Sequence, residues 1–128
     1  MDSHTDRFPQ SHLIIFGHPS TESFNAALAQ AYEETVRSRH HSTTRRDLYA
    51  LNFDPLLSES ERTASDLTRV RDDARHELEL ATQADVIVFV YPLWFGAPPA
   101  IVKGYLPPSS RFCAKSAQMR IYTLTKIR

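Results

Sequence analysis

The stretch "DVIVFVYP" (residues 85–92) decides the fold of this chain. Residues 86–90 are all β-branched or aromatic, and no polar residue interrupts them. A strand with one face in water alternates apolar and polar residues, whereas a continuous apolar run is typical of a strand covered on both faces. The stretch therefore predicts the central strand of a sheet that has helices on both sides.

Hydrophobic spacing in the rest of the chain predicts helices that alternate with strands. Strands are expected over residues 12–17, 43–51 and 119–125, helices over residues 24–40, 65–83 and 100–106, and a loop over residues 52–61. The apolar stripe expected on the first helix consists of Phe24, Leu28, Ala31, Tyr32, Thr35 and Val36. The stripe expected on the second consists of Leu67, Val70, Ala74, Leu78 and Ala81.

The alternation of strands and helices predicts an α/β domain with a doubly wound, mainly parallel sheet. We expect one three-layer domain over residues 12–106, with strand order 2-1-3-4. Residues 1–11 are expected to be disordered. Residues 107–128 form a basic tail that contains the candidate fourth strand, with five basic side chains and no acid: Arg111, Lys115, Arg120, Lys126 and Arg128.

Composition excludes several classes of protein. The 128 residues hold 15 basic and 15 acidic side chains, so overall charge gives no reason to expect a nucleic-acid or membrane-surface partner. The single cysteine, Cys113, cannot form an internal disulfide, and no apolar run is long enough to cross a bilayer. The N-terminus lacks the apolar core of a secretory signal. These features predict a soluble, cytoplasmic protein, and no histidine or cysteine spacing indicates a metal site.

The stretch "GHPSTESFNAAL" (residues 17–28) joins the first predicted strand to the first predicted helix. Backbone N–H groups at a helix N-terminus bind anions, and Ser20, Thr21, Ser23 and Asn25 add short polar side chains. The spacing matches neither of the common glycine-rich phosphate motifs. Two interpretations stay open: an anion site, or a helix that is simply capped by Ser20, Thr21 or Ser23.

The stretch "YPLWFGAPP" (residues 91–99) follows the central strand, and we call it the aromatic loop. Tyr91 continues the strand and is expected in the core, whereas Trp94 and Phe95 are expected to be exposed among prolines. In open α/β sheets, ligands bind where strand order reverses, which here lies between the first and third strands. A ligand with a phosphate tail and a flat ring, such as a flavin, would fit both stretches. The alternative is that the aromatic side chains fill the core.

Three segments together carry a resemblance to a known family. "GHPSTESFNAAL", "RRDLYALNFDP" and "YPLWFGAPPAIVKGYL" occur in the order found in the flavodoxin-like NAD(P)H:quinone oxidoreductases. That group includes modulators of drug activity and ancillary proteins of potassium-efflux systems. The resemblance covers residues 13–106 and implies a flavodoxin-like fold.

The resemblance implies bound FAD or FMN, and NAD(P)H as the co-substrate. It assigns the cofactor contacts to His18, Ser23, Phe24 and Asn25, and the lining of the flavin ring to Pro92, Leu93, Trp94, Phe95 and Gly96. Family members are homodimers that pass hydride from NAD(P)H through the flavin to quinone, azo or nitro acceptors. No residue is assigned as a catalytic acid or base.

The resemblance stops after Leu106. The family continues with a glycine loop after its fourth strand and with a fifth strand, and neither has a counterpart in residues 107–128. We therefore expect a chain truncated at its C-terminal side, with the fifth strand missing. Two alternatives to an active oxidoreductase remain: a regulatory or ancillary binding protein with little turnover, and an inactive fragment.

Overall fold

The structure is a computed structural model that describes residues 8–56, 58–59, 70–105 and 120–125. Its elements are β1 (Ser11–Phe16), α1 (Phe24–Ser38), β2 (Ser42–Asp47), α3 (Asp72–Gln83), β3 (Val86–Val90), α4 (Ala100–Tyr105) and β4 (Arg120–Leu124). The described strands form one parallel sheet in the order β2-β1-β3-β4, which confirms the predicted order 2-1-3-4.

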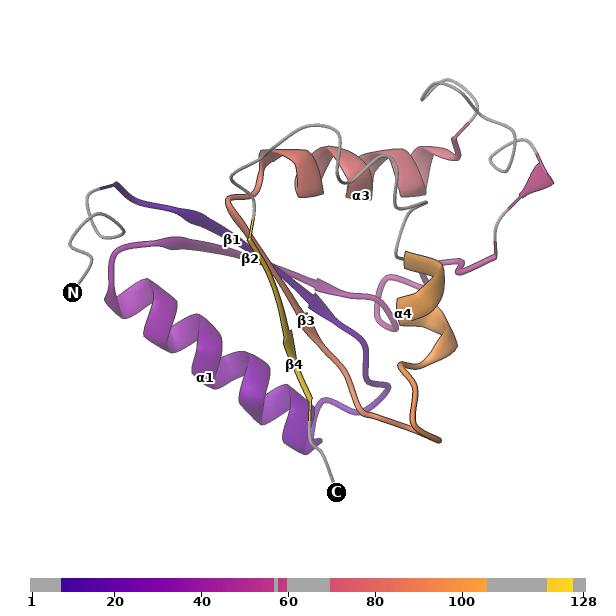
Figure 1. The fold of residues 1–128 in the computed structure, drawn as a ribbon, viewed down its shortest axis with the longest axis horizontal. Coiled ribbons are helices and arrows are strands. Elements are labelled where there is room, and N and C mark those ends of the chain that lie inside the picture. Colours follow the sequence, from indigo (N-terminus) through magenta and orange to yellow (C-terminus); the bar gives the residue numbers. More distant parts are fainter. Residues whose placement is uncertain (1–7, 57, 60–69, 106–119, 126–128) are drawn as a thin grey trace.

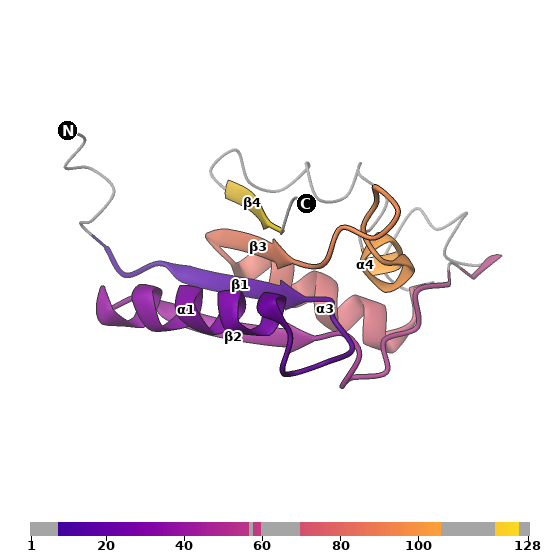
Figure 2. The ribbon, with the colours of Figure 1, turned by 90° about the horizontal axis from the view of Figure 1, so that it is seen from below.

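Helices cover both faces of the sheet (Figures 1 and 2). On one face, α1 packs against a cluster made by alternate residues of the central strands: Ile14, Phe16, Val86, Val88 and Val90, with Ala26 and Ala29 of the helix. On the other face lie α3 and α4, and their cluster includes Leu13, Ile15, Ile87, Phe89, Ala81, Val102 and Tyr105. All five residues of β3 are buried, as predicted for a strand covered on both faces.

Helix α1 buries only part of the stripe that the sequence predicts: Val36 is buried, and Leu28 and Tyr32 pack against the hydrophobic cluster. Its buried residues are Asn25, Ala26, Ala29, Glu33 and Val36, whereas Phe24 of the predicted stripe is 57% exposed. Small alanines let the helix approach the sheet closely, and Glu33 is buried because Arg45 of β2 pairs with it at 2.9 Å. The helix also ends at Ser38 rather than His40, which has a left-handed φ of 64°.

Helix α3 begins, within the described residues, at Asp72 rather than residue 65; residues 65–69 lie outside the described part. Its buried residues are Glu77 and Ala81; of the other residues in the predicted stripe, Val70, Ala74 and Leu78 are half-buried, and Leu67 lies outside the described residues. Strand β2 is shorter than predicted, since Leu48 turns into the core and residues 48–52 form a turn.

The structure describes residues on both sides of the predicted domain, which was expected over residues 12–106. At the start, Ser11 opens β1, and the backbone N–H of Gln10 donates to Nδ1 of His41 at 2.9 Å, so residues 10 and 11, expected to be disordered, belong to the fold. Of the predicted basic tail, only residues 120–125 are described, and there β4 pairs in parallel with β3. Leu106, Met119 and Cys113 lie outside the described residues.

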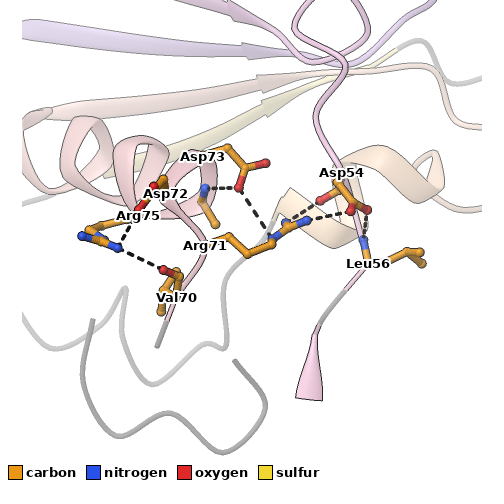
Figure 3. Close-up of polar contacts among 8 residues, drawn as sticks. Asp54, Leu56, Val70, Arg71, Asp72, Asp73 and Arg75 are labelled. Atoms are coloured by element: carbon orange, nitrogen blue, oxygen red, sulfur yellow. Dashed lines mark hydrogen bonds and ion pairs between the residues drawn. The ribbon is translucent and has the colours of Figure 1, made fainter. Parts of the chain in front are cut away.

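A polar cluster joins the segment around Asp54, after β2, to the residues at the start of α3 (Figure 3). The Arg71 side chain contacts Asp54 twice, through an ion pair of 2.7 Å to Oδ2 and a hydrogen bond of 2.8 Å to the backbone oxygen. Arg71 also faces Asp73, and Arg75 pairs with Asp72 at 2.8 Å. These side chains are largely in contact with water, where ion pairs of this kind position a loop more than they stabilise it.

Candidate functional site

The candidate site lies at the carboxyl ends of β1 and β3. These strands are neighbours, and the chain passes from β1 to β2 on one side and to β3 and β4 on the other. This is where strand order reverses, the usual ligand position in an open α/β sheet. The segment after β1, residues 17–23, which we call the polar turn, and the aromatic loop after β3 emerge at the same end of the sheet (Figure 1).

The polar turn is held by its own side chains. Oγ of Ser23 accepts from the N–H of Ala26 at 3.1 Å and donates to the oxygen of Ser20 at 2.9 Å. Ser23 is therefore the N-cap of α1, the role that the capped-helix interpretation gives it. Nδ1 of His18 accepts from the N–H of Ser20 at 2.9 Å, so the neutral ring carries its proton on Nε2. The turn is thus fixed before any ligand arrives.

Asn25 stands apart from the other polar residues of this region. It lies in the first turn of α1 and is only 4% exposed. Its Nδ2 group has no hydrogen-bond partner among the described residues. An unpaired buried amide costs about 1 to 3 kcal/mol, so a ligand oxygen at this position would remove an existing penalty. The donor chemistry fits the oxygen-rich side of a flavin, whose position the resemblance assigns to this residue.

The aromatic loop contains a two-residue hairpin. Trp94 and Ala97 exchange backbone hydrogen bonds of 3.0 Å in both directions, and Phe95 and Gly96 between them have φ of 52° and 74°. Positive φ at both central residues is the type I′ turn, which normally takes asparagine and glycine. A phenylalanine there is unusual and strained. Strain of this kind is often found where a side chain is held for binding.

The loop presents most of its side chains to solvent. Leu93 is 40%, Trp94 42% and Phe95 108% exposed, while Pro92 is buried. This exposure agrees with the prediction for Trp94 and Phe95. Tyr91 is half-buried and packs against the hydrophobic cluster, as predicted for a residue in phase with the strand.

His18 and Trp94 bring the polar turn and the aromatic loop together. Their ring centroids lie 5.5 Å apart with planes at 63°, an edge-to-face contact. The structure thus joins two of the predicted site residues directly and places Ser23, Phe24 and Asn25 on the helix that follows the same turn. Within the described residues, the contact between His18 and Trp94 is therefore the direct link between the polar turn and the aromatic loop.

Two contacts at this site have no counterpart in the predictions from sequence. Val102 of α4 packs so closely on Gly17 that a β-carbon there would lie 2.3 Å from its Cγ2. Oγ1 of Thr125, just after β4, donates to the oxygen of Tyr91 at 2.8 Å. The glycine directly after a buried strand is a signal that could have indicated the first contact, since glycine often marks a close approach.

A second cluster of titratable groups lies near the amino end of β1. Nδ1 of His12 is 2.7 Å from the Tyr32 hydroxyl, and the rings of His12 and His41 are 5.5 Å apart. Burial lowers the pKa of His12, and nearby His41 and Arg120 act in the same direction. Nδ1 of His41 accepts a hydrogen bond from the backbone N–H of Gln10 at 2.9 Å. The cluster lies at the opposite end of the strand from His18.

In the part of the chain that is described, no helix has the length and apolar character needed to span a membrane.

Comparison with known proteins gives consistent matches. Residues 10–107 match a family model described as "Flavodoxin-like fold". An uncharacterised NAD(P)H oxidoreductase of Haemophilus influenzae is 42% identical over 97 residues, covering 75% of this chain and 48% of that protein. The structure of an NAD(P)H:quinone oxidoreductase from Methanothermobacter marburgensis matches with a TM-score of 0.77 at 25% identity, over 92% of this chain and 66% of the other.

A more distant structure shares the fold. It is an FMN-dependent NADH-azoreductase from Bacillus anthracis in complex with FMN, with a TM-score of 0.68 at 15% identity over 90% of this chain and 68% of the other. The chain spans about half the length of the curated relatives it matches.

Proposed function

Since this chain belongs to the flavodoxin-like family, we propose that it binds a flavin and acts as an NAD(P)H oxidoreductase that reduces quinone-type acceptors. The relatives with that printed activity support the class of reaction. Because the chain spans about half of those relatives, the whole activity is a proposal for this chain in the context that completes it.

The contact between His18 and Trp94 carries this proposal. It connects the polar turn before α1 to a loop of exposed aromatic rings at the switch point of the sheet. A flavin mononucleotide has the same two parts, a phosphate and a flat ring, at the ends of a short chain. The unpaired Nδ2 of Asn25 adds a donor that a cofactor oxygen would satisfy.

Each predicted residue has a role in this proposal. His18, Ser23, Phe24 and Asn25 would hold the phosphate and ribityl side, and Pro92, Leu93, Trp94, Phe95 and Gly96 would line the ring. A bound flavin supplies the hydride chemistry, while this chain binds it, orients it and shields one of its faces. Either FMN or FAD satisfies this assignment, and the same holds for NADH and NADPH.

We also propose a homodimer in the cytoplasm, with quinone-type, azo or nitro compounds as acceptors. Exposed apolar side chains on the aromatic loop and on β4, among them Phe95, Ile121 and Tyr122, support a partner surface. The molar mass of the purified chain in solution, measured by light scattering, tests the dimer.

Flavin titration tests the proposal directly. FMN and FAD are added separately to the purified chain, and the fluorescence of flavin and protein is followed. We expect saturable binding that Asn25→Ala weakens about tenfold, the effect of one lost hydrogen bond to a buried donor. Gln30→Ala is the matched control, since it removes an exposed amide from the same helix.

The outcomes separate the alternatives. Binding followed by NAD(P)H oxidation in the presence of a simple quinone supports the oxidoreductase. Binding without turnover favours the ancillary role. If neither flavin binds, the proposed function is wrong for this chain.

A further inference from the structure

Helix α4 contacts both walls of the candidate site. Its Val102, 1% exposed, lies directly over Gly17 at the start of the polar turn. The same helix begins at the end of the aromatic loop, where the oxygen of Pro99 accepts from the N–H groups of Val102 and Lys103 at 3.0 and 3.1 Å. A shift of α4 would therefore move the two walls relative to each other.

The far end of α4 is held by a buried polar network. The Tyr105 hydroxyl donates to Oε2 of Glu77 on α3 at 3.1 Å, and Oε1 of Glu77 accepts from Nε and Nη2 of Arg46 on β2 at 2.9 and 2.6 Å. Burial, and then the Glu77 carboxylate, raise the pKa of Tyr105 far above its ordinary value. The hydroxyl thus keeps its proton and remains a donor.

Aromatic packing alone does not fix the helix in this way. The Tyr105 ring makes edge-to-face contacts with Phe53 and Phe89, with centroids 5.3 and 6.3 Å apart. Such contacts tolerate sliding, whereas a hydrogen bond to a charged, buried oxygen is directional and strong. The hydroxyl is therefore the group that sets the position of the ring, and with it the position of α4.

We propose that Tyr105 and Val102 are positioning residues of the flavin site: through α4, they set the spacing between the polar turn and the aromatic loop. Neither residue needs to touch the cofactor. The proposal rests on the proposed function for its ligand, but the spacing that it concerns exists without ligand.

Tyr105→Phe tests the hydroxyl while keeping the ring. Tyr32→Phe is the matched control, because it also removes a hydroxyl that has one hydrogen-bond partner. That partner is His12, near the amino end of β1, whereas the candidate site lies at the carboxyl end. Trp94 is the only tryptophan of the 128 residues, so protein fluorescence reports on its contact with His18. We expect Tyr105→Phe to change the Trp94 emission without flavin and to weaken FMN binding about fivefold, typical of a change that acts at a distance.

A second pair of variants tests the contact of α4 with the polar turn. Gly17→Ala places a methyl group against Val102 and should displace the helix, and Val102→Ala removes the clashing carbon. We expect Gly17→Ala to alter Trp94 emission and to weaken FMN binding by about tenfold or more. The double variant should recover most of both signals, because the methyl group at position 17 then no longer meets Val102 Cγ2.

The results separate this proposal from the proposed function. Altered Trp94 emission in Tyr105→Phe but not in Tyr32→Phe, with rescue in the double variant, supports it even if FMN does not bind. It is overturned if Tyr105→Phe keeps the emission and FMN affinity of the original chain, or if Val102→Ala does not rescue Gly17→Ala. Should Tyr105→Phe fail to fold, as judged by circular dichroism, the Gly17 and Val102 variants decide.

Discussion

Strand β2 forms one edge of the described sheet with the polar sequence STTRRD, whereas β4 forms the other edge with Ile121 and Tyr122 about half exposed. In β2, Arg45 and Arg46 point to opposite faces because successive side chains of a strand alternate. Arg45 pairs with Glu33 of α1, and Arg46 pairs with Glu77 of α3. Strand β2 is thus connected to both helical layers by its side chains.

The described contacts of β4 are of another kind. It pairs with β3 through the backbone, and just after it Thr125 holds the oxygen of Tyr91. The comparison shows that hydrophobicity alone does not indicate how firmly an edge strand is held. A polar edge can be fixed by buried ion pairs, while an apolar edge can keep its side chains in solvent. Four experiments test this difference.

The largest effect is expected from Glu77→Gln. The change leaves Arg46 without its charge partner in a mostly buried position, with side-chain exposures of 22% for Arg46 and 8% for Glu77. We expect the free energy of unfolding in urea to fall by about 3 kcal/mol, the low end of the range for a broken buried pair. Glu79→Gln, on the exposed side of the same helix, should change it by no more than about 0.5 kcal/mol. If Glu77→Gln and Glu79→Gln lowered the free energy of unfolding equally, the ion pair between Arg46 and Glu77 would not stabilise the fold.

A smaller effect is expected from Glu33→Gln. Arg45 is 30% exposed and also lies over the Phe16 ring, with its guanidinium carbon 5.7 Å from the ring centroid. Water and the ring thus compensate in part for the lost carboxylate. We expect a loss of about 1 to 2 kcal/mol in the same urea experiment. A loss greater than that of Glu77→Gln would reverse the proposed order of the two pairs.

The pH dependence of stability should report on His12, which lies between the two edges. Because its pKa is lowered in the folded state, chiefly by burial, the unfolded chain binds the proton more readily. Above the ordinary histidine pKa of about 6.5, neither state binds the proton, and His12 costs the fold no stability. As the pH falls below that value, the unfolded chain takes up the proton first, and the free energy of unfolding decreases. The free energy of unfolding in urea, measured between about pH 7.5 and pH 5, should fall less steeply with decreasing pH for His12→Gln than for His76→Gln. Arg120→Ala should reduce the slope in part, since Arg120 of β4 also lowers this pKa.

The smallest effect on stability is expected at β4. Ile121→Lys replaces a side chain that is 53% exposed, so the free energy of unfolding should change by less than about 0.5 kcal/mol. Self-association at high concentration should decrease, because a charge on an edge strand opposes pairing with another chain. Thr44→Lys on β2 is the control and should alter neither quantity. Sedimentation measures the association, and a loss of stability similar to that of Glu33→Gln would show that Ile121 belongs to the core.

The sequence was sufficient to predict the central strands and their order. The apolar runs of β1 and β3 do not alternate with polar residues. Such strands are buried on both faces, so they belong at the centre of the sheet and not at its edges. The helix faces were predicted less well. Glu33 and Glu77 look like surface residues because each partner lies on β2, and a helical pattern contains no information about a distant arginine.

The arrangement of the two segments at the candidate site was predicted in part. The meeting of the polar turn and the aromatic loop follows from parallel strand order, because neighbouring strands end at the same edge. Which side chain would be left unpaired, as at Nδ2 of Asn25, depends on packing that no local pattern specifies. The contact of Val102 with Gly17 likewise depends on where α4 lies, and that position is set by Tyr105 and Glu77.

The left-handed Phe95 has a consequence for engineering this protein. Glycine or asparagine would fit the first central position of the type I′ turn better, by about 1 kcal/mol, so a search for stabilising substitutions would select Phe95→Gly or Phe95→Asn early. The same substitution would delete the most exposed aromatic ring of the proposed flavin surface. Stability and binding are therefore in conflict at this one residue, and gains in thermal resistance there should be checked against cofactor affinity.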